Sequence, residues 1–502
     1  MAHRRATTVD RSVFNAPTVH VVPQSSTACS RQSTTGIGNT AMSNVQRFGA
    51  TGDGATDDTE ALRHAIRDGD GMLHFPPGSY RITQTIEFKL SESGPLGIDG
   101  TSGTARVLMA GPGPAFRLVG THQGTGDPSS VKGNVYPSQR LPTIRNIEIE
   151  GAHPEADGIQ LIQTMQSVFE GVLLRRCRHG IHLTERNRNV LISHCHVYYN
   201  SGVGIFLDHV NLHQIIIASS HISYNRLGGI RIDGSEIRNL QITGNDIEYN
   251  NHAQHNTDAE PTAEIYVDTT APGSSVNEIT ISSNTIQATS SPGGCNIRIR
   301  EAAGGNARPP GLWSISGNII GSQENNVHLT GCYGVSLSGN CIYSCGSRNL
   351  LIEDSRQINV GTNTFRRHTP RMGTGVRIVR SSDVTVTGCS MLDEHPDGQP
   401  SGASLLELVE SDRINVSGCQ LIDGVPCGID AADCSHVNIT GCTIHDTRQP
   451  SKSHHAVRFT GQGRGNLVGL NSIGGTSQSA LALEDTAGVT AEANVLPAAS
   501  EG

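Results

Sequence analysis

The most constraining feature of this sequence is a short pattern that recurs along most of its length. An apolar residue, any residue and a second apolar residue are followed by two small or polar residues and then Asn, Cys or Ser, as in VLISHC (190–195) and LQITGN (240–245). Most repeats are 22–30 residues apart. The last position of the pattern falls at Cys177, Cys195, Ser220, Asn245, Asn284, Asn318, Asn340, Asn363, Cys389, Cys419, Cys442, Asn471 and Asn494.

Each repeat also contains a second short apolar strand that begins Gly-Ile or an equivalent pair, for example Gly180-Ile181 and Gly229-Ile230. Strands of three to five residues cannot bury a core alone, but strands stacked at a fixed period share one continuous interior. The alternation has the period of a strand and not of a helix. The repeats therefore predict an all-β solenoid, a parallel β-helix.

The recurring Asn position is expected to form an amide ladder at an inner bend, with neighbouring side chains one coil apart, ~4.8 Å along the stack. Cysteine replaces Asn at Cys177, Cys195, Cys389, Cys419 and Cys442. A small thiol packs well at such a bend. The twelve cysteines contain no CxxC pair, so we expect reduced structural thiols.

Composition excludes several classes of protein. No apolar run approaches the ~20 residues that a transmembrane helix needs, and a net charge of −9 argues against nucleic acid as the main partner. The N terminus lacks the apolar stretch of a secretory signal, so a cytoplasmic location is expected. Residues 1–42 show no period and are predicted to be a disordered tail, with Met42 as an alternative start.

The regular region opens with FGATGDGATDDTEAL (48–62), followed by FPPGSYRI (75–82). This resembles the start of right-handed parallel β-helix proteins of the pectate-lyase-like superfamily, which includes polygalacturonases, pectate lyase 3-type proteins and phage tailspikes. The resemblance implies a right-handed β-helix of roughly 12–14 coils whose first coil is covered by an N-terminal helix. We expect the cap and first coils over residues 43–140 and the body over 141–497, with structural roles for Asp53, Asp57 and Asp58.

Members of this superfamily mostly hydrolyse, eliminate or epimerise acidic sugars along one outer face. In the Gly-Ile strands of this chain, alternate residues point outward, which places Asp208, Asp233 and Asp268 in register on three successive coils. Adjacent carboxyls would approach the ~5–5.5 Å separation of retaining glycosidases. Three like charges should also raise one pKa and supply a general acid.

We therefore expect an enzyme that cleaves an acidic oligo- or polysaccharide by carboxylate acid/base hydrolysis, without a cofactor. Asp208 and Asp233 form the predicted catalytic pair, and Asp268 is a third acid. Arginines can hold a uronate carboxylate through two hydrogen bonds. The predicted substrate-binding residues are His182, Arg231, Tyr266, Arg298, Arg300 and Glu248.

A neighbouring face offers a rival set of catalytic groups. His213 and His221 are second-rank catalytic candidates, because a His beside a carboxylate one coil away can act as a general base. Metal binding by His194, His196 and His221 lacks a recognised ligand spacing, so no metal site is predicted.

Other activities remain open at this point. The segments EADGI (155–159) and RHG (178–180) resemble parts of the polygalacturonase motifs and supply Asp157 and His179, but the Asp-Asp pair and the final Arg-Ile-Lys of those motifs are missing. A lyase or epimerase would use Arg or His, with calcium held by the same aspartates, because no lysine lies between Lys132 and Lys452. A third possibility is a non-catalytic, tailspike-like solenoid that binds carbohydrate as a homotrimer.

Overall fold

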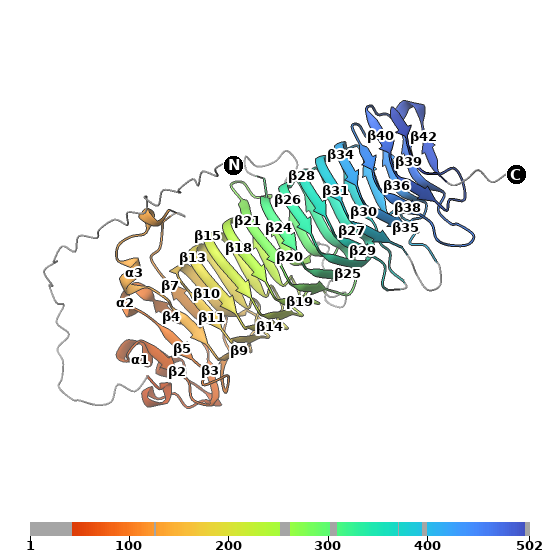
Figure 1. The fold of residues 1–502 in the computed structure, drawn as a ribbon. Helices are drawn as coiled ribbons and strands as arrows, with labels where there is room; N and C mark the ends of the chain where they lie inside the picture. Colours follow the sequence, from red (N-terminus) through yellow and green to blue (C-terminus); the bar gives the residue numbers. More distant parts are fainter. Residues whose placement is uncertain are drawn as a thin grey trace, which may run out of the picture. The chain divides into compact units, whose positions relative to one another are not determined.

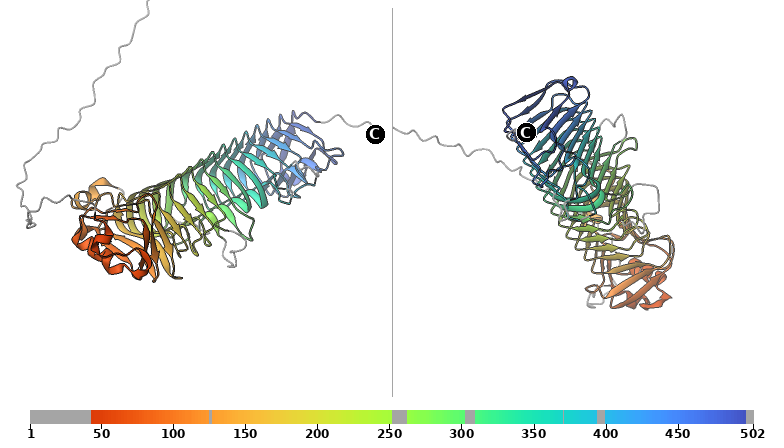
Figure 2. Two further views of the ribbon diagram at one scale, coloured as in Figure 1. Left: turned by 90° about the horizontal axis from the view of Figure 1, so that it is seen from below. Right: turned by 90° about the vertical axis from the view of Figure 1, so that its right-hand side faces the viewer.

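A computed structural model describes residues 43–124, 127–251, 262–301, 309–369, 371–393 and 399–496. Most of these residues lie in short parallel strands, and the chain winds through them to form a stack of coils (Figure 1). In Figure 2 the coils follow one another in sequence order from the red to the blue end. The predicted tail, residues 1–42, lies outside the described residues.

Each coil contributes strands to three parallel sheets, named A, B and C in the order in which the chain meets them from Ile86 onward. Sheet A carries the predicted Gly-Ile strands. Its members are β4 (Ile86–Lys89), β7 (Gly113–Val119), β10 (Ala156–Met165), β13 (Ile181–Ser193), β15 (Ile205–Ala218), β17 (Ile230–Asp233), β20 (Ala263–Asp268), β23 (Cys295–Arg300), β25 (Ile319–Thr330), β27 (Cys341–Glu353), β30 (Val376–Val379), β33 (Leu406–Val409), β36 (Cys427–Ala432), β39 (His455–Thr460) and β42 (Leu481–Leu483).

Sheets B and C close each coil. The long strands β13 and β15 bend from sheet A into B, and β25 and β27 bend from C into A. The other members of sheet B are β2 (Met72–His74), β5 (Gly97–Asp99), β8 (Thr143–Arg145), β11 (Val168–Glu170), β18 (Glu236–Thr243), β21 (Ser275–Ser282), β24 (Gly311–Ser316), β26 (Tyr333–Ser338), β28 (Arg356–Gly361), β31 (Ser382–Thr387), β34 (Asp412–Ser417), β37 (Asn438–Thr440), β40 (Asn466–Gly469) and β43 (Val489–Glu492).

Sheet C consists of strands of three to five residues. Besides the first residues of β25 and β27, its members are β1 (Asp53–Asp57), β3 (Gly78–Ile82), β6 (Ala105–Met109), β9 (Glu148–Gly151), β12 (Leu173–Arg175), β14 (His196–Tyr198), β16 (His221–Ser223), β19 (Asp246–Glu248), β22 (Thr285–Gln287), β29 (Thr364–Arg366), β32 (Ser390–Leu392), β35 (Gln420–Ile422), β38 (Thr443–His445) and β41 (Ser472–Gly474).

The core follows from strand alternation. In β15, Ile205 and Leu207 are fully buried, whereas Phe206 and Asp208 between and after them face outward. The same alternation recurs in the strands of sheet A that pair with it. Parallel pairing stacks the inward residues into one continuous apolar column along the coils.

The predicted amide ladder is present at the bend between sheets B and C. Asn245, Asn284, Asn318, Asn340 and Asn363 are buried, and each of the first four donates its side-chain amide to the side-chain oxygen of the next at 2.9–3.0 Å. Cys195, Cys389, Cys419 and Cys442 occupy the same column and are also buried. The prediction is wrong for Cys177, which follows β12 at the bend between sheets C and A, where its backbone N–H donates to Asn200. All eleven described cysteines are free thiols, as expected from the sequence.

A short helix covers the first coil. Helix α1 (Thr59–Asp68) buries Leu62 and Ala65 against the core. Asp57 accepts hydrogen bonds from the backbone N–H and hydroxyl of Thr59, while Asp58 accepts from the backbone of the preceding loop. The predicted all-β parallel β-helix with an N-terminal capping helix is thus confirmed.

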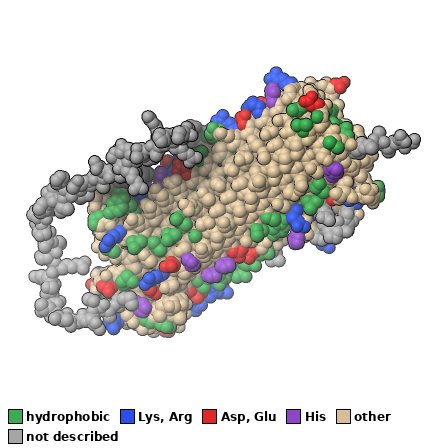
Figure 3. Space-filling model, in the orientation of Figure 1, with side chains coloured by type: hydrophobic (Ala, Val, Ile, Leu, Met, Phe, Trp, Pro, Cys, Tyr) green, Lys and Arg blue, Asp and Glu red, His purple; other side chains and the backbone are tan. Residues whose placement is uncertain are grey.

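Chemical character differs between the outer faces. The broad face over β21, β24, β26 and β28 in Figure 3 consists mainly of uncharged polar side chains and backbone. Its outward residues are short, such as Thr280, Ser314 and Ser336. In the described ranges no helix is long and apolar enough to cross a membrane. Within the same ranges, no three His, Cys, Asp or Glu side chains are placed to hold a metal ion, and His194, His196 and His221 form no such group.

Candidate active site on sheet A

The three predicted aspartates lie in register on adjacent strands of sheet A. Asp208 of β15 pairs with Asp233 of β17, which pairs with Asp268 of β20. A second outward column lies two residues before these aspartates and contains Phe206, Arg231 and Tyr266. The two columns therefore place carboxylates, a guanidinium and aromatic rings on one wall.

Asp208 is held between two histidines. His182 Nε2 lies 3.1 Å from Asp208 Oδ2, and His209 Nδ1 lies 2.7 Å from Oδ1. The hydrogen bond from His182, with that from His209, lowers the pKa of Asp208 to about 2 despite partial burial. Asp208 is therefore a carboxylate at any pH at which the protein would work.

Asp233 has the opposite character. Its side chain is only 20% exposed, Arg231 Nε donates to Oδ2 at 2.8 Å, and the buried Oδ1 has no hydrogen-bond partner among the described residues. Burial raises the pKa of Asp233; Arg231 opposes the shift, and the charges of Asp268 and Asp208 add to it. A proton on this carboxyl removes the cost of burying an unpaired charged oxygen.

Asp268 is bound to groups of its own coil and the next. Tyr266 donates its hydroxyl to Oδ2 at 3.1 Å, and the backbone N–H and hydroxyl of Thr270 donate to Oδ1. Arg300 NH1 lies 3.7 Å from Oδ2. The guanidinium of Arg231 lies 5.1 Å from the centre of the Tyr266 ring, a cation–π contact that links the coils of Asp233 and Asp268.

An aromatic group borders the aspartates on the N-terminal side. The rings of His182 and Phe206 stack with centres 5.2 Å apart, and His179 lies 5.2 Å from Phe206. The backbone N–H of Val203 donates to His179 Nδ1, so the proton of the neutral ring is on Nε2. Burial lowers the pKa of His179 to about 4 and keeps the ring neutral above that pH.

The remaining predicted arginine, Arg298, follows Tyr266 in the second outward column, but its side chain turns toward the start of its own strand. Its guanidinium donates to the Gly293 carbonyl and contacts the Cys295 sulfur. One coil further, His328 Nε2 lies 2.7 Å from Glu353 Oε2. The same face thus carries a second His–carboxylate pair that was not predicted from the sequence.

Three predicted residues do not join this group. His213 lies where β15 passes toward sheet B, in register with Arg188 and Arg238. His221 and Glu248 lie on sheet C, where His221 Nδ1 is 3.2 Å from Asp246 and Glu248 accepts from Gln287. The structure therefore separates the second-rank candidates His213 and His221, and the predicted substrate-binding residue Glu248, from the aspartate column.

The polygalacturonase-like residues Asp157 and His179 meet through the backbone. Asp157 accepts from the His179 N–H at 3.0 Å, and its two oxygens form a double hydrogen bond with Arg178. With both oxygens of Asp157 occupied, this pair positions the turn before sheet A. Only the ring of His179 reaches the aromatic group described above.

A family model described as "Right handed beta helix region" matches residues 134–306 and 325–496, more than half of the chain. The chain belongs to this right-handed β-helix family. Residues 42–98 of this β-helix protein match a second model, "Rhamnogalacturonase A/epimerase, pectate lyase-like". The resemblance seen in residues 48–82 is thereby confirmed, and the handedness expected from it is that of the family.

Solved structures similar to this β-helix protein include phage proteins. The pre-mature bacteriophage phi29 gene product 12 has a TM-score of 0.52 at 13% identity, with 88% of this chain and 66% of that chain covered. The Dettilon tailspike protein has 0.48 at 15% identity, with 83% and 68% covered. This chain therefore spans about two thirds of their length, and the similarity shows the fold alone.

An enzyme structure also appears among the similar folds. The A-module of the Azotobacter vinelandii mannuronan C-5 epimerase AlgE6 has a TM-score of 0.32 at 17% identity, with 90% of this chain and 98% of that chain covered. No curated protein matches this β-helix protein by sequence.

Two contributors to the site of this β-helix protein were not selected from sequence. His209 follows Asp208 directly, but a residue after the last outward position has no fixed direction in a strand pattern. Its positive φ of 47° turns the ring back onto Asp208. Phe206 stands in the outward column, and only the ring geometry reveals its stacking on His182.

Proposed function

We propose that this protein is a carbohydrate-active enzyme that cleaves glycosidic bonds of a uronate-containing oligo- or polysaccharide on sheet A. The observation that carries the proposal is the pairing of Asp208 and Asp233 on adjacent strands with pKa values shifted in opposite directions. A pair of carboxyl groups whose environments separate their pKa values is the arrangement that acid/base glycoside hydrolysis requires.

The roles follow from the two environments. Asp233 is the proton donor to the glycosidic oxygen, because burial favours its protonated form. Asp208 remains ionised and attacks the anomeric carbon, as the ~5 Å spacing of adjacent rungs favours a retaining reaction. In the second step Asp233, now a carboxylate, takes a proton from water as that water displaces Asp208 from the sugar.

The neighbouring groups suit an acidic substrate. Arg231 and Arg300 bring positive charge to the aspartate column, and Phe206 with His182 offers a flat aromatic surface for a sugar ring. Such guanidinium groups bind carboxylates directionally. The N-terminal family model, named for both rhamnogalacturonases and epimerases, supports a sugar substrate of this class.

One observation favours a second activity, uronate elimination or epimerisation. Both oxygens of Asp208 are engaged by histidines, so Asp208 can instead hold His182 or His209 as the base that removes a proton from the sugar. Hydrolysis and elimination both create new reducing ends, but only elimination creates an unsaturated uronate that absorbs ultraviolet light.

The test is incubation with a panel of uronate polymers, assayed for reducing ends, for ultraviolet absorbance and for a change in sugar configuration by NMR. New reducing ends without absorbance support hydrolysis, and absorbance identifies a lyase. A polymer that binds without any chemical change overturns the enzyme proposal in favour of a binding solenoid. The homotrimer and the cytoplasmic location expected from the sequence remain predictions.

A further inference from the structure

A stack of tyrosines lines the turn that leads from sheet C into sheet A. Tyr199, Tyr224 and Tyr249 occupy the same turn position on three successive coils, each with a positive φ of 55–58°. The Tyr199 and Tyr224 ring centres are 5.0 Å apart, and those of Tyr224 and Tyr249 are 5.4 Å apart. The first ring is 56% exposed. The Tyr199 ring does not contribute to the core, so its outer side is available to a ligand.

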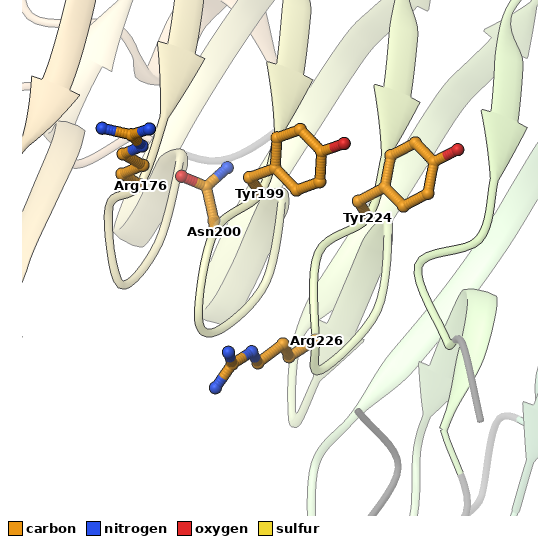
Figure 4. A pocket seen from close by; sticks show the side chains of 5 residues that line it. All are labelled: Arg176, Tyr199, Asn200, Tyr224 and Arg226. Carbon is orange, nitrogen blue, oxygen red and sulfur yellow. The ribbon is translucent and has the colours of Figure 1, made fainter. Parts of the chain in front are cut away.

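The N-terminal end of the stack borders a pocket of about 350 Å³. Its lining consists of Arg176, Tyr199, Asn200, Tyr224 and Arg226. Figure 4 shows Arg176 one coil before Tyr199, on the side of the ring that faces away from Tyr224. Arg226 extends from the next turn toward the turn that carries Asn200. A pocket with an aromatic wall between two guanidinium groups is thus open to solvent.

The pocket is positively charged. Arg176 donates to Glu150, which is only 7% exposed and also binds Arg106 and Arg175. Arg175 is shared with Glu148, so three arginines face two carboxylates and an excess of positive charge remains. The exposed Arg226 side chain makes no hydrogen bond or ion pair with any residue that the structure describes. An unpaired guanidinium beside a pocket that contains no carboxylate favours an anionic ligand.

Asn200 forms the floor of the pocket and fixes its shape. It is 1% exposed, accepts from the Cys177 backbone N–H at 2.9 Å and donates to Asn225 at 2.7 Å. These bonds hold successive turns together, so the pocket walls are parts of a rigid ladder. A ligand that enters the pocket would meet a preformed surface.

We propose that this pocket is an accessory subsite that binds one uronate residue of the glycan, with its ring against Tyr199 and its carboxylate on Arg226 and Arg176. The proposal rests on the proposed function and names a second contact for the same substrate. The turn 199–204 separates the pocket from the catalytic face, and Gly202 packs so closely on the His179 ring that a Cβ there would lie 2.8 Å from it. A glycan crossing this turn would reach both sites.

An accessory subsite adds affinity for long chains through effective concentration, because the second contact becomes intramolecular. We therefore expect the pocket to matter more as the oligosaccharide lengthens. A small anion alone would gain only the charge and not the ring contact. Chain-length dependence and sensitivity to the aromatic ring are thus the two signatures of a sugar subsite.

The experiment measures binding of uronate oligomers of increasing length by calorimetry, in an Asp208→Asn background that prevents turnover. Tyr199→Ala and Arg226→Gln should each weaken binding of the longest oligomers about tenfold or more, with a loss that grows with length. Tyr199→Phe should restore it. The matched control is Tyr333→Ala with Arg356→Gln, an exposed Tyr–Arg pair with a 4.5 Å cation–π contact on sheet B, where no loss is expected.

The outcomes separate this inference from the proposed function. One outcome is that the Asp208→Asn protein binds uronate oligomers, the protein that retains Asp208 cleaves polymer, and both pocket variants bind with unchanged affinity. This outcome overturns the subsite alone. A second outcome is that the pocket variants lose affinity while the protein that retains Asp208 cleaves no polymer. This outcome supports the subsite and overturns the proposed enzymatic function. If inorganic sulfate competes equally well against every oligomer length and Tyr199→Ala has no effect, the pocket binds anions and not sugars, which overturns the subsite. Absence of uronate binding overturns both.

Discussion

His182 Nε2 lies 3.1 Å from Asp208 Oδ2, on the strand one coil away. This contact keeps Asp208 ionised and oriented for its proposed role as the nucleophile. Asn cannot take that role, so Asp208→Asn should lower kcat on the identified substrate by about 10²–10⁴-fold. Asp233→Asn should have a comparable effect, since it removes the proton that burial retains. Steady-state kinetics on the best polymer of the panel measure both losses. Full activity in both variants would reject this catalytic pair.

A matched carboxylate on the same sheet provides the control. Asp430 is 19% exposed and bonded to Arg458 Nε at 2.8 Å, much as Asp233 is 20% exposed and bonded to Arg231. Asp430→Asn therefore removes an equivalent ion pair several coils away and should leave kcat within about twofold, because Asp430 lies outside the aspartate column that would contact the sugar.

The pH profile should respond to Arg231. Burial raises the pKa of Asp233, and the guanidinium of Arg231 opposes that rise. Arg231→Met removes the opposing charge, so the pKa of Asp233 should rise further and the alkaline limb of kcat/KM should move to higher pH. A limb that stays in place or moves to lower pH would show that Asp233 is not the acid. Profiles of both enzymes at constant ionic strength measure the shift.

Glu264 should make the protein less stable at alkaline pH. It ends a second buried ladder, in which Asn200 donates to Asn225, Asn225 to Asn250 and Asn250 to the carboxyl oxygens of Glu264. Burial raises the pKa of Glu264 from 4.5 to about 8. The folded state therefore binds a proton that the unfolded state releases between these values. Its contribution to stability is complete below pH 4.5 and is lost as the pH rises through about 8.

Thermal unfolding between pH 5 and 9 tests this coupling. The wild-type Tm should fall as the pH rises across this range, and Glu264→Gln, which cannot titrate, should flatten the dependence. Other groups contribute to both proteins equally, so the difference between the two curves isolates Glu264. An unchanged pH dependence in the variant would contradict the assignment.

The amide ladder should stabilise the stack strongly. Asn284 donates to the Ile242 carbonyl and to Asn318 and accepts from the backbone and side chain of Asn245. Asn284→Ala leaves these buried partners unsatisfied and should cost about 2–4 kcal/mol. Thr280→Ala, on the outer face of the same coil, should cost less than about 0.5 kcal/mol. Denaturant unfolding of both variants compares the two costs, and equal costs would argue against a stabilising ladder.

The sequence alone was sufficient to predict the winding of the chain and the register of Asp208, Asp233 and Asp268. A parallel β-helix makes this possible because its strands alternate with a period of two and its coils stack one above another, so equivalent positions of the repeat become neighbours. The same rule aligns Phe206, Arg231 and Tyr266, which lie two residues before these aspartates.

Only the tertiary structure decided how these neighbours interact. The turn that brings His209 onto Asp208, the burial that separates the pKa values of Asp208 and Asp233, and the position of Arg226 beside Tyr199 depend on side-chain direction and solvent access. Repeat spacing specifies which backbone positions are adjacent. It carries no information on rotamers, on turn conformation or on which side chains exclude water, and these determine the chemistry of the wall.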